Sequence, residues 1–197
     1  MREKAEYKSA VRSRKMIRQA FVELMQEKDV EKITVTDIVT RADINRGTFY
    51  AHYKDTHAVL EQIENEIIDK MLYFLKEFNY NNFFKTPLPL LLKVARYLEE
   101  NFEYYHILIS AKGSEQFIEK LKNIYMEYMV NDKNIPASVR NTHEFIILTN
   151  FFAGGIVNLY RTWFLGEIDQ PLDEISTVLS EFIISSTAAL LEKEFRK

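Results

Sequence analysis

The chain has 197 residues, of which 47% are hydrophobic and 28% charged, the balance of a globular protein rather than a disordered one. Because it contains no cysteine, disulfides, thiolate metal ligands and a cysteine nucleophile are excluded. Only five glycines and four prolines interrupt it, which favours an all-helical fold over a turn-rich sandwich or barrel. The net charge of −3 is too small to indicate a partner by itself.

The charge is unevenly distributed along the chain. Residues 1–55 hold 12 Lys and Arg against 9 Asp and Glu, whereas the remainder holds 14 against 20, so the two parts carry +3 and −6. A basic first part on an acidic remainder suggests contact with a polyanion such as DNA. A lysine-rich first helix that only keeps the terminus solvated explains the pattern equally well.

Nothing at the amino terminus is typical of a secretory signal, because the first residues are charged rather than apolar. The most apolar stretch, Phe145 to Phe164, contains Thr, Asn and Arg, and is too polar for a membrane span of roughly 20 apolar residues. We therefore expect a cytoplasmic protein without membrane contact.

Hydrophobic periodicity predicts four helices in the first third of the chain. The first covers roughly residues 8–27, with an apolar stripe of Ile17, Ala20, Phe21 and Leu24. The second follows Thr34, which with Asp37 has the spacing of a capping box. The third starts after Asn45, a good N-cap, and runs to about His52, and a fourth, longer helix starts near Asp55.

Further helices are predicted along the rest of the chain, after a loop at 79–89. They cover roughly 88–101, 102–111, 114–130, 137–164 and 172–194, which gives about nine helices in all. Neither a repeat nor a long linker separates them. We place the boundary between the two parts within the fourth helix, which joins a small first part to a larger second part, and assign residues 1–55 to the first and residues 56–197 to the second.

Residues 34–53 have the pattern of a helix-turn-helix motif: two short helices joined by a tight turn behind a longer supporting helix. Apolar positions supply an inward face, and Arg46, Thr48, Tyr50 and His52 point outward from the second short helix. Gly47 keeps the start of that helix slim, so that the backbone can approach a phosphate or a base. A helical hairpin with a polar outer face but no DNA partner fits the same pattern.

The segment Ile33 to Asp55, ITVTDIVTRADINRGTFYAHYKD, resembles the amino-terminal signature of the TetR family of bacterial transcription regulators. The resemblance covers about 50 residues, including the basic first helix. Two positions depart from the family pattern. Asp43 stands where glycine is usual, so we expect it at positive φ, and Tyr53 replaces a common phenylalanine and should pack in its place.

The resemblance implies roles for particular residues at DNA. The DNA-binding residues are Thr36, Asn45, Arg46, Thr48, Tyr50, His52 and Lys54. Thr36 would donate to a phosphate, while Arg46 and Thr48 would face bases, because Arg fits guanine O6 and N7 and the threonine methyl fits thymine. The last three residues in the list would hold phosphates, which fix register without choosing sequence.

Aromatic residues are concentrated in the second part of the chain: 13 of the 26 lie between Tyr73 and Tyr128. Core packing explains them, but an apolar cavity with polar tips, suited to a small effector, is the functional alternative. Its candidate liners are Tyr97, Tyr104, Tyr105, Tyr125 and Asn158. Gly154 and Gly155 fall within a predicted helix and favour close helix packing over phosphate binding.

No enzyme, metal or cofactor motif stands out. The four histidines lack the spacing of a metal site, and no nucleophile elbow, Walker or dinucleotide-binding fingerprint occurs. We therefore expect a protein with no cofactor that is not an enzyme.

The resemblance implies an all-α homodimer that pairs through its last two helices and reads a palindromic double-stranded DNA operator. In this reading residues 1–55 bind DNA, and residues 56–197 bind an effector and dimerise. The predicted function is a sequence-specific transcription regulator, a repressor released by a small effector. Three alternatives stay open.

The first alternative is an activator or co-regulator whose second part binds a partner protein. It is suggested because the second part of the chain loosely resembles family members akin to dihydroxyacetone kinase operon activators, at the Tyr104–Tyr105 segment and at FFAGGIVNLYRTWFLGEI (Phe151 to Ile168). The second is a small-molecule carrier or enzyme with a vestigial DNA-binding part. The third is a helical adaptor.

Overall fold

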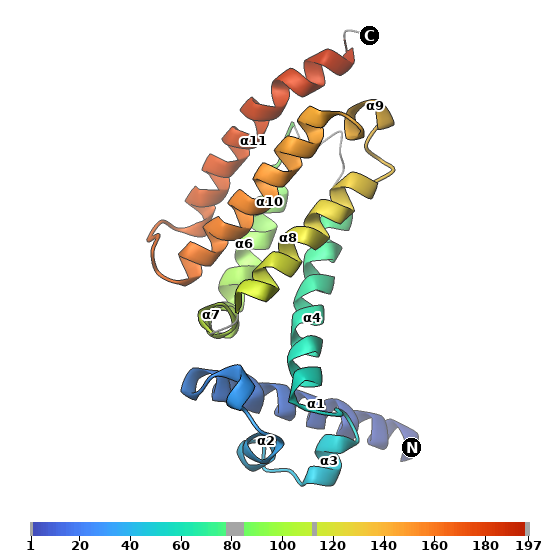
Figure 1. Ribbon diagram of the computed structural model, residues 1–197, viewed down its shortest axis with the longest axis vertical. Helices are drawn as coiled ribbons and strands as arrows, with labels where there is room; N and C mark the ends of the chain where they lie inside the picture. The colour runs from blue at the N-terminus through green and yellow to red at the C-terminus, as the bar shows by residue number, and fades with distance from the viewer. Residues whose placement is uncertain (1, 78–84, 112–113, 196–197) are drawn as a thin grey trace. The chain divides into compact units, whose positions relative to one another are not determined.

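The computed structural model describes residues 2–77, 85–111 and 114–195 (Figure 1). These residues form ten α-helices and one 3-10 turn, with no β-strand among them, which confirms the all-α prediction. They divide into two compact units: Met1–Ile67 with His106–Glu115 (unit 1), and Ile68–Tyr105 with Gln116–Lys197 (unit 2). Most of the loop expected at 79–89 lies outside the described residues.

Unit 1 is built on α1 (Arg2–Glu27), which supports η1 (Val30–Lys32), α2 (Val35–Arg41) and α3 (Arg46–Tyr50). The predicted stripe on α1 is buried: Ile17, Phe21 and Leu24 are at most 4% exposed. The start of α1 was predicted six residues too late. Its first turns are rich in charged residues, so hydrophobic periodicity gave no signal there.

The two capping predictions in unit 1 are confirmed. The backbone N–H of Asp37 donates to the Thr34 hydroxyl at 3.2 Å, and the backbone N–H of Thr34 donates to the Asp37 carboxylate at 2.8 Å. Asn45 caps α3 by accepting from the backbone N–H of Thr48 at 2.7 Å. These caps satisfy orphan donors of helices too short to be stable alone.

The two departures from the family pattern behave as expected. Asp43 has a φ of 51°, the left-handed geometry that the turn requires. Tyr53 is 4% exposed and its ring centroid lies 5.9 Å from that of Phe49. The buried Tyr53 hydroxyl has no hydrogen-bond partner among the described residues. A phenylalanine at this position would bury no unpaired polar group, so the hydroxyl lowers stability.

Helices α4 (Thr56–Lys76) and α7 (Phe102–Ser110) are each divided between the two units. Helix α4 contributes its first part to unit 1 and its last part to unit 2, whereas α7 contributes its first part to unit 2 and its last part to unit 1. Helices α6 (Leu88–Glu100) and α8 (Ser114–Asn131) agree with the predicted ranges within one residue at each end.

One element of unit 2 was predicted wrongly. The single helix expected at 137–164 is two helices, α9 (Ala137–Arg140) and α10 (His143–Phe164). Asn141 ends α9, and Thr142 caps α10 by accepting from the backbone N–H of Phe145 at 3.2 Å. The apolar residues before and after the break at 141–142 continue one helical period, so hydrophobic periodicity did not predict the break.

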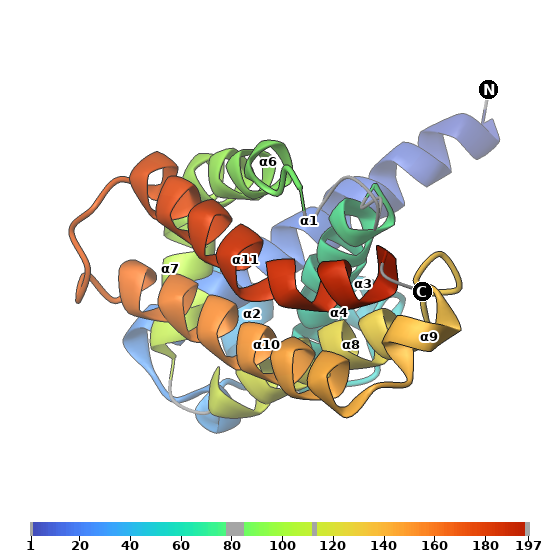
Figure 2. The same cartoon turned by 90° about the horizontal axis from the view of Figure 1, so that it is seen from above.

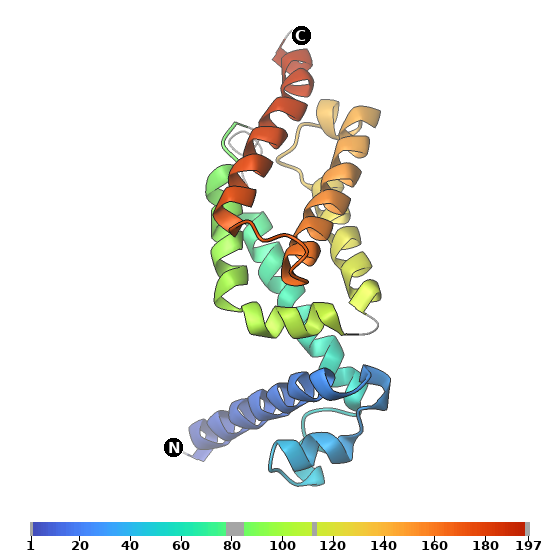
Figure 3. The same ribbon diagram turned by 90° about the vertical axis from the view of Figure 1, so that its left-hand side faces the viewer.

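Helix α11 (Leu172–Phe195) runs between α6 and α10 (Figures 2 and 3). Buried Leu91 of α6, Phe152 of α10 and Ile183 of α11 form the core where the three helices meet. A second cluster, Met129, Ile135, Val139 and Phe145, joins the end of α8 to α9 and the start of α10. Over the described residues, no helix is both long and apolar enough to cross a membrane.

Candidate nucleic-acid interface

The frame of the α2–α3 motif is held by short-range contacts. Lys28, just after α1, places its ammonium 2.9 Å from the Asp37 carboxylate at the start of α2. Donation from the Thr34 backbone N–H, and next from Lys28, lowers the Asp37 pKa to about 2. The carboxylate also lies at a helix N-terminus, where negative charge is favourable. The start of α2 is thereby tied to the end of α1.

The predicted DNA-binding residues lie on one part of unit 1, at the start of α2 and along α3 to the loop before α4. Thr36, Asn45, Arg46, Tyr50 and Lys54 are exposed, and Thr48 and His52 are partly buried. Phe49, on the opposite side of α3, is fully buried. The helix thus anchors itself with one face and presents polar side chains on the other.

Two of these polar side chains are held in place by neighbours. The Arg46 guanidinium Nη2 donates to the Thr36 hydroxyl at 2.7 Å. The Thr48 hydroxyl donates to the Asn45 side-chain oxygen at 3.1 Å. The Tyr50 ring rests edge-on against Phe49, with ring centroids 5.5 Å apart, and stays 55% exposed.

The cations around the motif differ in their partners. Arg41 turns toward α1, with Nη2 2.6 Å from Glu27 Oε1 and Nη1 3.5 Å from Glu23 Oε2. Arg46 instead bonds a neutral hydroxyl, so its charge is not offset by a carboxylate at that contact. Sequence reasoning did not find the Arg46–Thr36 bond, because no periodicity links residues ten positions apart across a turn.

The five candidate effector-pocket residues are not brought together. Tyr97 and Tyr105 are joined by a hydroxyl–hydroxyl hydrogen bond of 2.7 Å, and the Tyr104 ring lies 5.8 Å from that of Tyr105. Burial raises the pKa of Tyr105. Tyr125 packs instead against the cluster of Met129, Ile135, Val139 and Phe145, and Asn158 lines a groove elsewhere on α10. The spacing of apolar residues along the chain does not indicate which helices pack against one another, so it could not show which of these residues lie together.

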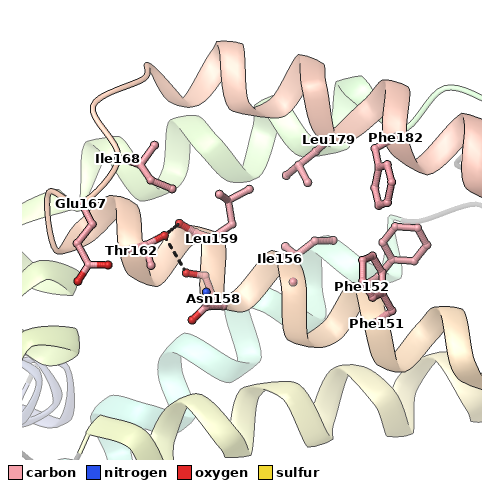
Figure 4. Close-up of a pocket in the computed structure, with 11 residues that line it drawn as sticks. Phe151, Phe152, Ile156, Asn158, Leu159, Thr162, Glu167, Ile168, Leu179 and Phe182 are labelled. Atoms are coloured by element: carbon pink, nitrogen blue, oxygen red, sulfur yellow. Dashed lines mark hydrogen bonds between the residues drawn. The ribbon is translucent and has the colours of Figure 1, made fainter.

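Asn158 lines a groove of about 440 Å³ between α10 and α11 (Figure 4). Figure 4 shows Phe151 and Phe152 of α10 gathered near Phe182 of α11 at one end, with Asn158, Thr162 and Glu167 toward the other. The Phe151 ring lies 5.9 Å from the Phe182 ring. The groove is therefore mainly apolar, with a few polar groups at one end.

The same two helices expose large apolar side chains. Ile147 is 66% exposed, Phe151 57%, Val178 60% and Phe182 45%. We call these four residues the α10–α11 face. Gly154 and Gly155 lie mid-helix as expected, but apart from their chain neighbours and the adjacent backbone of α10, no atom of the described residues lies within 4 Å of a Cβ placed at either. The close packing predicted for them is not made within the described chain.

Comparisons with known proteins match both parts of the chain. Residues 17–63 match the family described as "Bacterial regulatory proteins, tetR family", and residues 85–185 match a "Transcriptional regulator C-terminal region". The second match alone covers more than half of the chain.

Two relatives are transcription regulators by their names. The HTH-type dhaKLM operon transcriptional activator DhaS of Lactococcus lactis is 33% identical over 112 residues, which cover 56% of this chain and 56% of that protein. The chain thus matches little more than half of the activator's length. The uncharacterized HTH-type transcriptional regulator YvdT of Bacillus subtilis is 28% identical over 148 residues, 73% of this chain and 76% of that protein.

A solved structure shares the fold. NalD of Pseudomonas aeruginosa, described as the secondary repressor of the MexAB-OprM multidrug efflux pump, superposes with a TM-score of 0.64. The superposition covers 90% of this chain and 97% of that one at 16% identity.

Proposed function

Because this chain belongs to the TetR family of bacterial regulatory proteins, it is a DNA-binding transcriptional regulator, and we propose that it reads an inverted-repeat operator as a homodimer. The observation that carries the proposal is the capped α2–α3 motif. It buries Phe49 and leaves Arg46 and Tyr50 exposed. Residues 1–55 would bind DNA, and residues 56–197 would dimerise and take up an effector.

The motif residues divide into three roles. Arg46 and the Thr48 methyl would contact base edges, because a guanidinium matches guanine O6 and N7 and a methyl matches that of thymine. Thr36, Tyr50, His52 and Lys54 would contact phosphates, and Asn45 would hold α3 at the required angle through its cap. Regulation would then need binding alone and no catalytic step.

A second copy would cover the α10–α11 face. Four large apolar side chains stand exposed there, beside two glycines that leave room for the close approach of another helix. Large exposed apolar patches on globular proteins mark interaction sites. A two-fold interface would use the same patch on both copies, and it would present two α3 helices to two half-sites.

We propose repression as the direction of regulation, relieved when an effector favours a conformation with lower operator affinity. Such a ligand acts only if its affinity differs between the two conformations. Activation with the help of a partner protein is the second candidate. It is favoured by the 33% identity to a protein named as an operon activator. Deleting the gene separates the two, since operator-linked transcripts would rise for a repressor and fall for an activator.

The DNA-binding proposal is tested by selecting duplexes from a random pool, at moderate and at higher salt. We expect the selection to enrich an inverted repeat at both salt concentrations. Arg46→Ala should cost about 1–3 kcal/mol on the selected operator and relax one base position in each half-site. Lys54→Ala serves as the matched control, because loss of a phosphate contact should weaken all sequences alike and reduce the salt dependence. Equal losses on operator and random DNA for both variants would contradict the assignment of Arg46.

A further inference from the structure

We propose that Thr36 is a positioning residue that sets the base preference of Arg46, in addition to its contact with the DNA backbone. The inference rests on the proposed function, since it concerns how the motif reads its operator. It assigns the hydrogen bond between the two helices of the motif a role in specificity.

The backbone positions of Thr36 and Arg46 are fixed by the starts of the two helices to which they belong. Thr36 stands in the first turn of α2, two residues after the cap Thr34, and Arg46 is the first residue of α3, directly after the cap Asn45. Both caps are made, so the backbone at each end of the bond is held. The Arg46 side chain is exposed and long, and the 2.7 Å bond to the Thr36 hydroxyl holds its far end.

The chemistry of the hydroxyl allows it to serve two partners. A threonine hydroxyl has one donor and two acceptor lone pairs. Because it accepts from Arg46, its own O–H is left to donate to a phosphate oxygen. A guanidinium has five N–H donors, so Arg46 keeps four for bases and phosphates after donating one to Thr36. The phosphate contact that fixes register and the side chain that reads a base are thereby joined through one oxygen.

The neutral partner is also suited to this task. A carboxylate in place of the hydroxyl would offset the charge of Arg46 and repel phosphates. The hydroxyl directs the side chain while keeping its charge for DNA. A side chain already held in one orientation loses less conformational entropy when it binds, and the gain applies only to the base that this orientation matches. The bond should therefore increase discrimination more than affinity.

The fold of the α2–α3 motif does not depend on the hydrogen bond between Thr36 and Arg46. The turn between α2 and α3 is closed by the backbone bond from Ile44 N to Val39 O at 3.0 Å, and Ile38 and Phe49 pack in the core beneath it. The Thr36–Arg46 bond lies outside that core, on the exposed side of the motif. Removing it should leave the fold of unit 1 intact.

The test compares Thr36→Val, which keeps the shape and removes the hydroxyl, with Thr36→Ser, which keeps the hydroxyl. Thr40→Val, a turn later on the same helix and also exposed, is the matched control. Affinities of the full-length variants are measured on the selected operator and on a duplex changed at the base pair whose preference Arg46→Ala relaxes. Melting temperatures establish that each variant is folded.

We expect Thr36→Val to reduce the affinity ratio between the two duplexes by about three- to tenfold, a fraction of what loss of a bidentate base contact costs. Thr36→Ser and Thr40→Val should keep the ratio. In an Arg46→Ala background, Thr36→Val should weaken both duplexes alike and leave the ratio unchanged. That coupling is the readout that a structural or phosphate-only role does not produce.

Other outcomes overturn the inference. If Thr36→Val weakens both duplexes equally in the presence of Arg46, Thr36 contacts phosphate only. If it increases the ratio, the bond restrains Arg46 rather than directing it, and if Arg46→Ala relaxes no base pair, Arg46 reads none. In each of these cases the wild-type protein still selects an operator, whereas failure of the proposed function is recognised separately by the absence of any selected sequence.

Discussion

The α2–α3 motif and the α10–α11 face differ in how far their side chains find partners within one chain. In the motif, polar side chains find partners within a few residues: Thr34 with Asp37, and Asn45 with Thr48. On the α10–α11 face, Phe151 remains 57% exposed although it contacts Phe182. The motif is complete within one chain, whereas the face exposes apolar area that a single chain does not cover.

This difference separates the two tasks of the regulator. A surface that reads DNA must keep its polar groups available in water, so its frame has to be stabilised locally by caps and a small buried side. A surface that holds two copies together gains from apolar area removed from water on association. Four substitutions test the contrast, two of them at the caps and turn of the motif.

The largest effect is expected at the α10–α11 face. Phe151→Glu would place a charge in the centre of the proposed interface, where like charges and desolvation cost several kcal/mol, so the dimer dissociation constant should rise at least about a hundredfold. Sedimentation at several concentrations measures it. Tyr73→Glu is the matched control, since Tyr73 is 50% exposed and belongs to α4, which is not part of this face. A Phe151→Glu protein that stays dimeric would show that the copies pair elsewhere.

The turn of the motif gives the next effect. Asp43 sits at a φ of 51°, which costs about 1–2 kcal/mol for most residues and less for aspartate and glycine. Asp43→Ala should therefore be about 1 kcal/mol less stable than Asp43→Gly in denaturant unfolding. Equal stability of the two variants would mean that the turn relaxes into another conformation.

A smaller effect, with a distinct pH dependence, is expected at the cap of α2. The Asp37 pKa is held at about 2, below its ordinary 3.8, so the charged carboxylate stabilises the folded state above about pH 4, and this is lost as pH falls toward 2. Asp37→Asn should lower stability by about 0.5 kcal/mol at neutral pH, as for a charge at a helix N-terminus.

Amide hydrogen exchange in α2 measures this difference locally. The gap between wild type and Asp37→Asn should narrow as pH falls from about 4 to 2, because the wild-type carboxyl then becomes neutral as well. A gap that does not change with pH would assign the effect to packing rather than to the charge.

The smallest effect concerns the buried hydroxyl of Tyr53, which has no partner among the described residues. Tyr53→Phe should raise the free energy of unfolding by about 0.5 kcal/mol, because it removes a buried hydroxyl that has no hydrogen-bond partner. Tyr105→Phe is the control in unit 2: its hydroxyl donates to Tyr97, so the same change should lower stability by about 1 kcal/mol. Destabilisation by Tyr53→Phe would mean that its hydroxyl is satisfied in solution.

Local features of this molecule could be predicted from sequence, and non-local ones could not. The caps at Thr34 and Asn45 depend on residues within four positions, so the local sequence contains what determines them, whereas the left-handed Asp43 was expected from the family pattern of the turn. The break at Thr142 was missed although its cap is equally local, because the apolar period continues across it.

Contacts between distant elements account for the rest. The Arg46 side chain finds Thr36 only because the turn brings two helix starts together, and no pattern along the chain encodes that distance. Tyr125 and Tyr105 are both tyrosines on predicted helices, yet Tyr125 packs against the cluster of Met129, Ile135, Val139 and Phe145, whereas Tyr105 bonds Tyr97. Candidate pocket residues chosen by type were therefore distributed among separate places.

The central claim is that two copies, joined through their α10–α11 faces, hold two α3 helices on one inverted repeat. It is tested most directly by binding the full-length protein to the selected operator and to an operator with about 5 extra base pairs, half a helical turn, between its half-sites. We predict two protomers on the original operator and a loss of at least about a hundredfold in affinity on the respaced one, because the second half-site then faces the other side of the duplex. Equal affinity on both duplexes, or one protomer on the original, would contradict the claim.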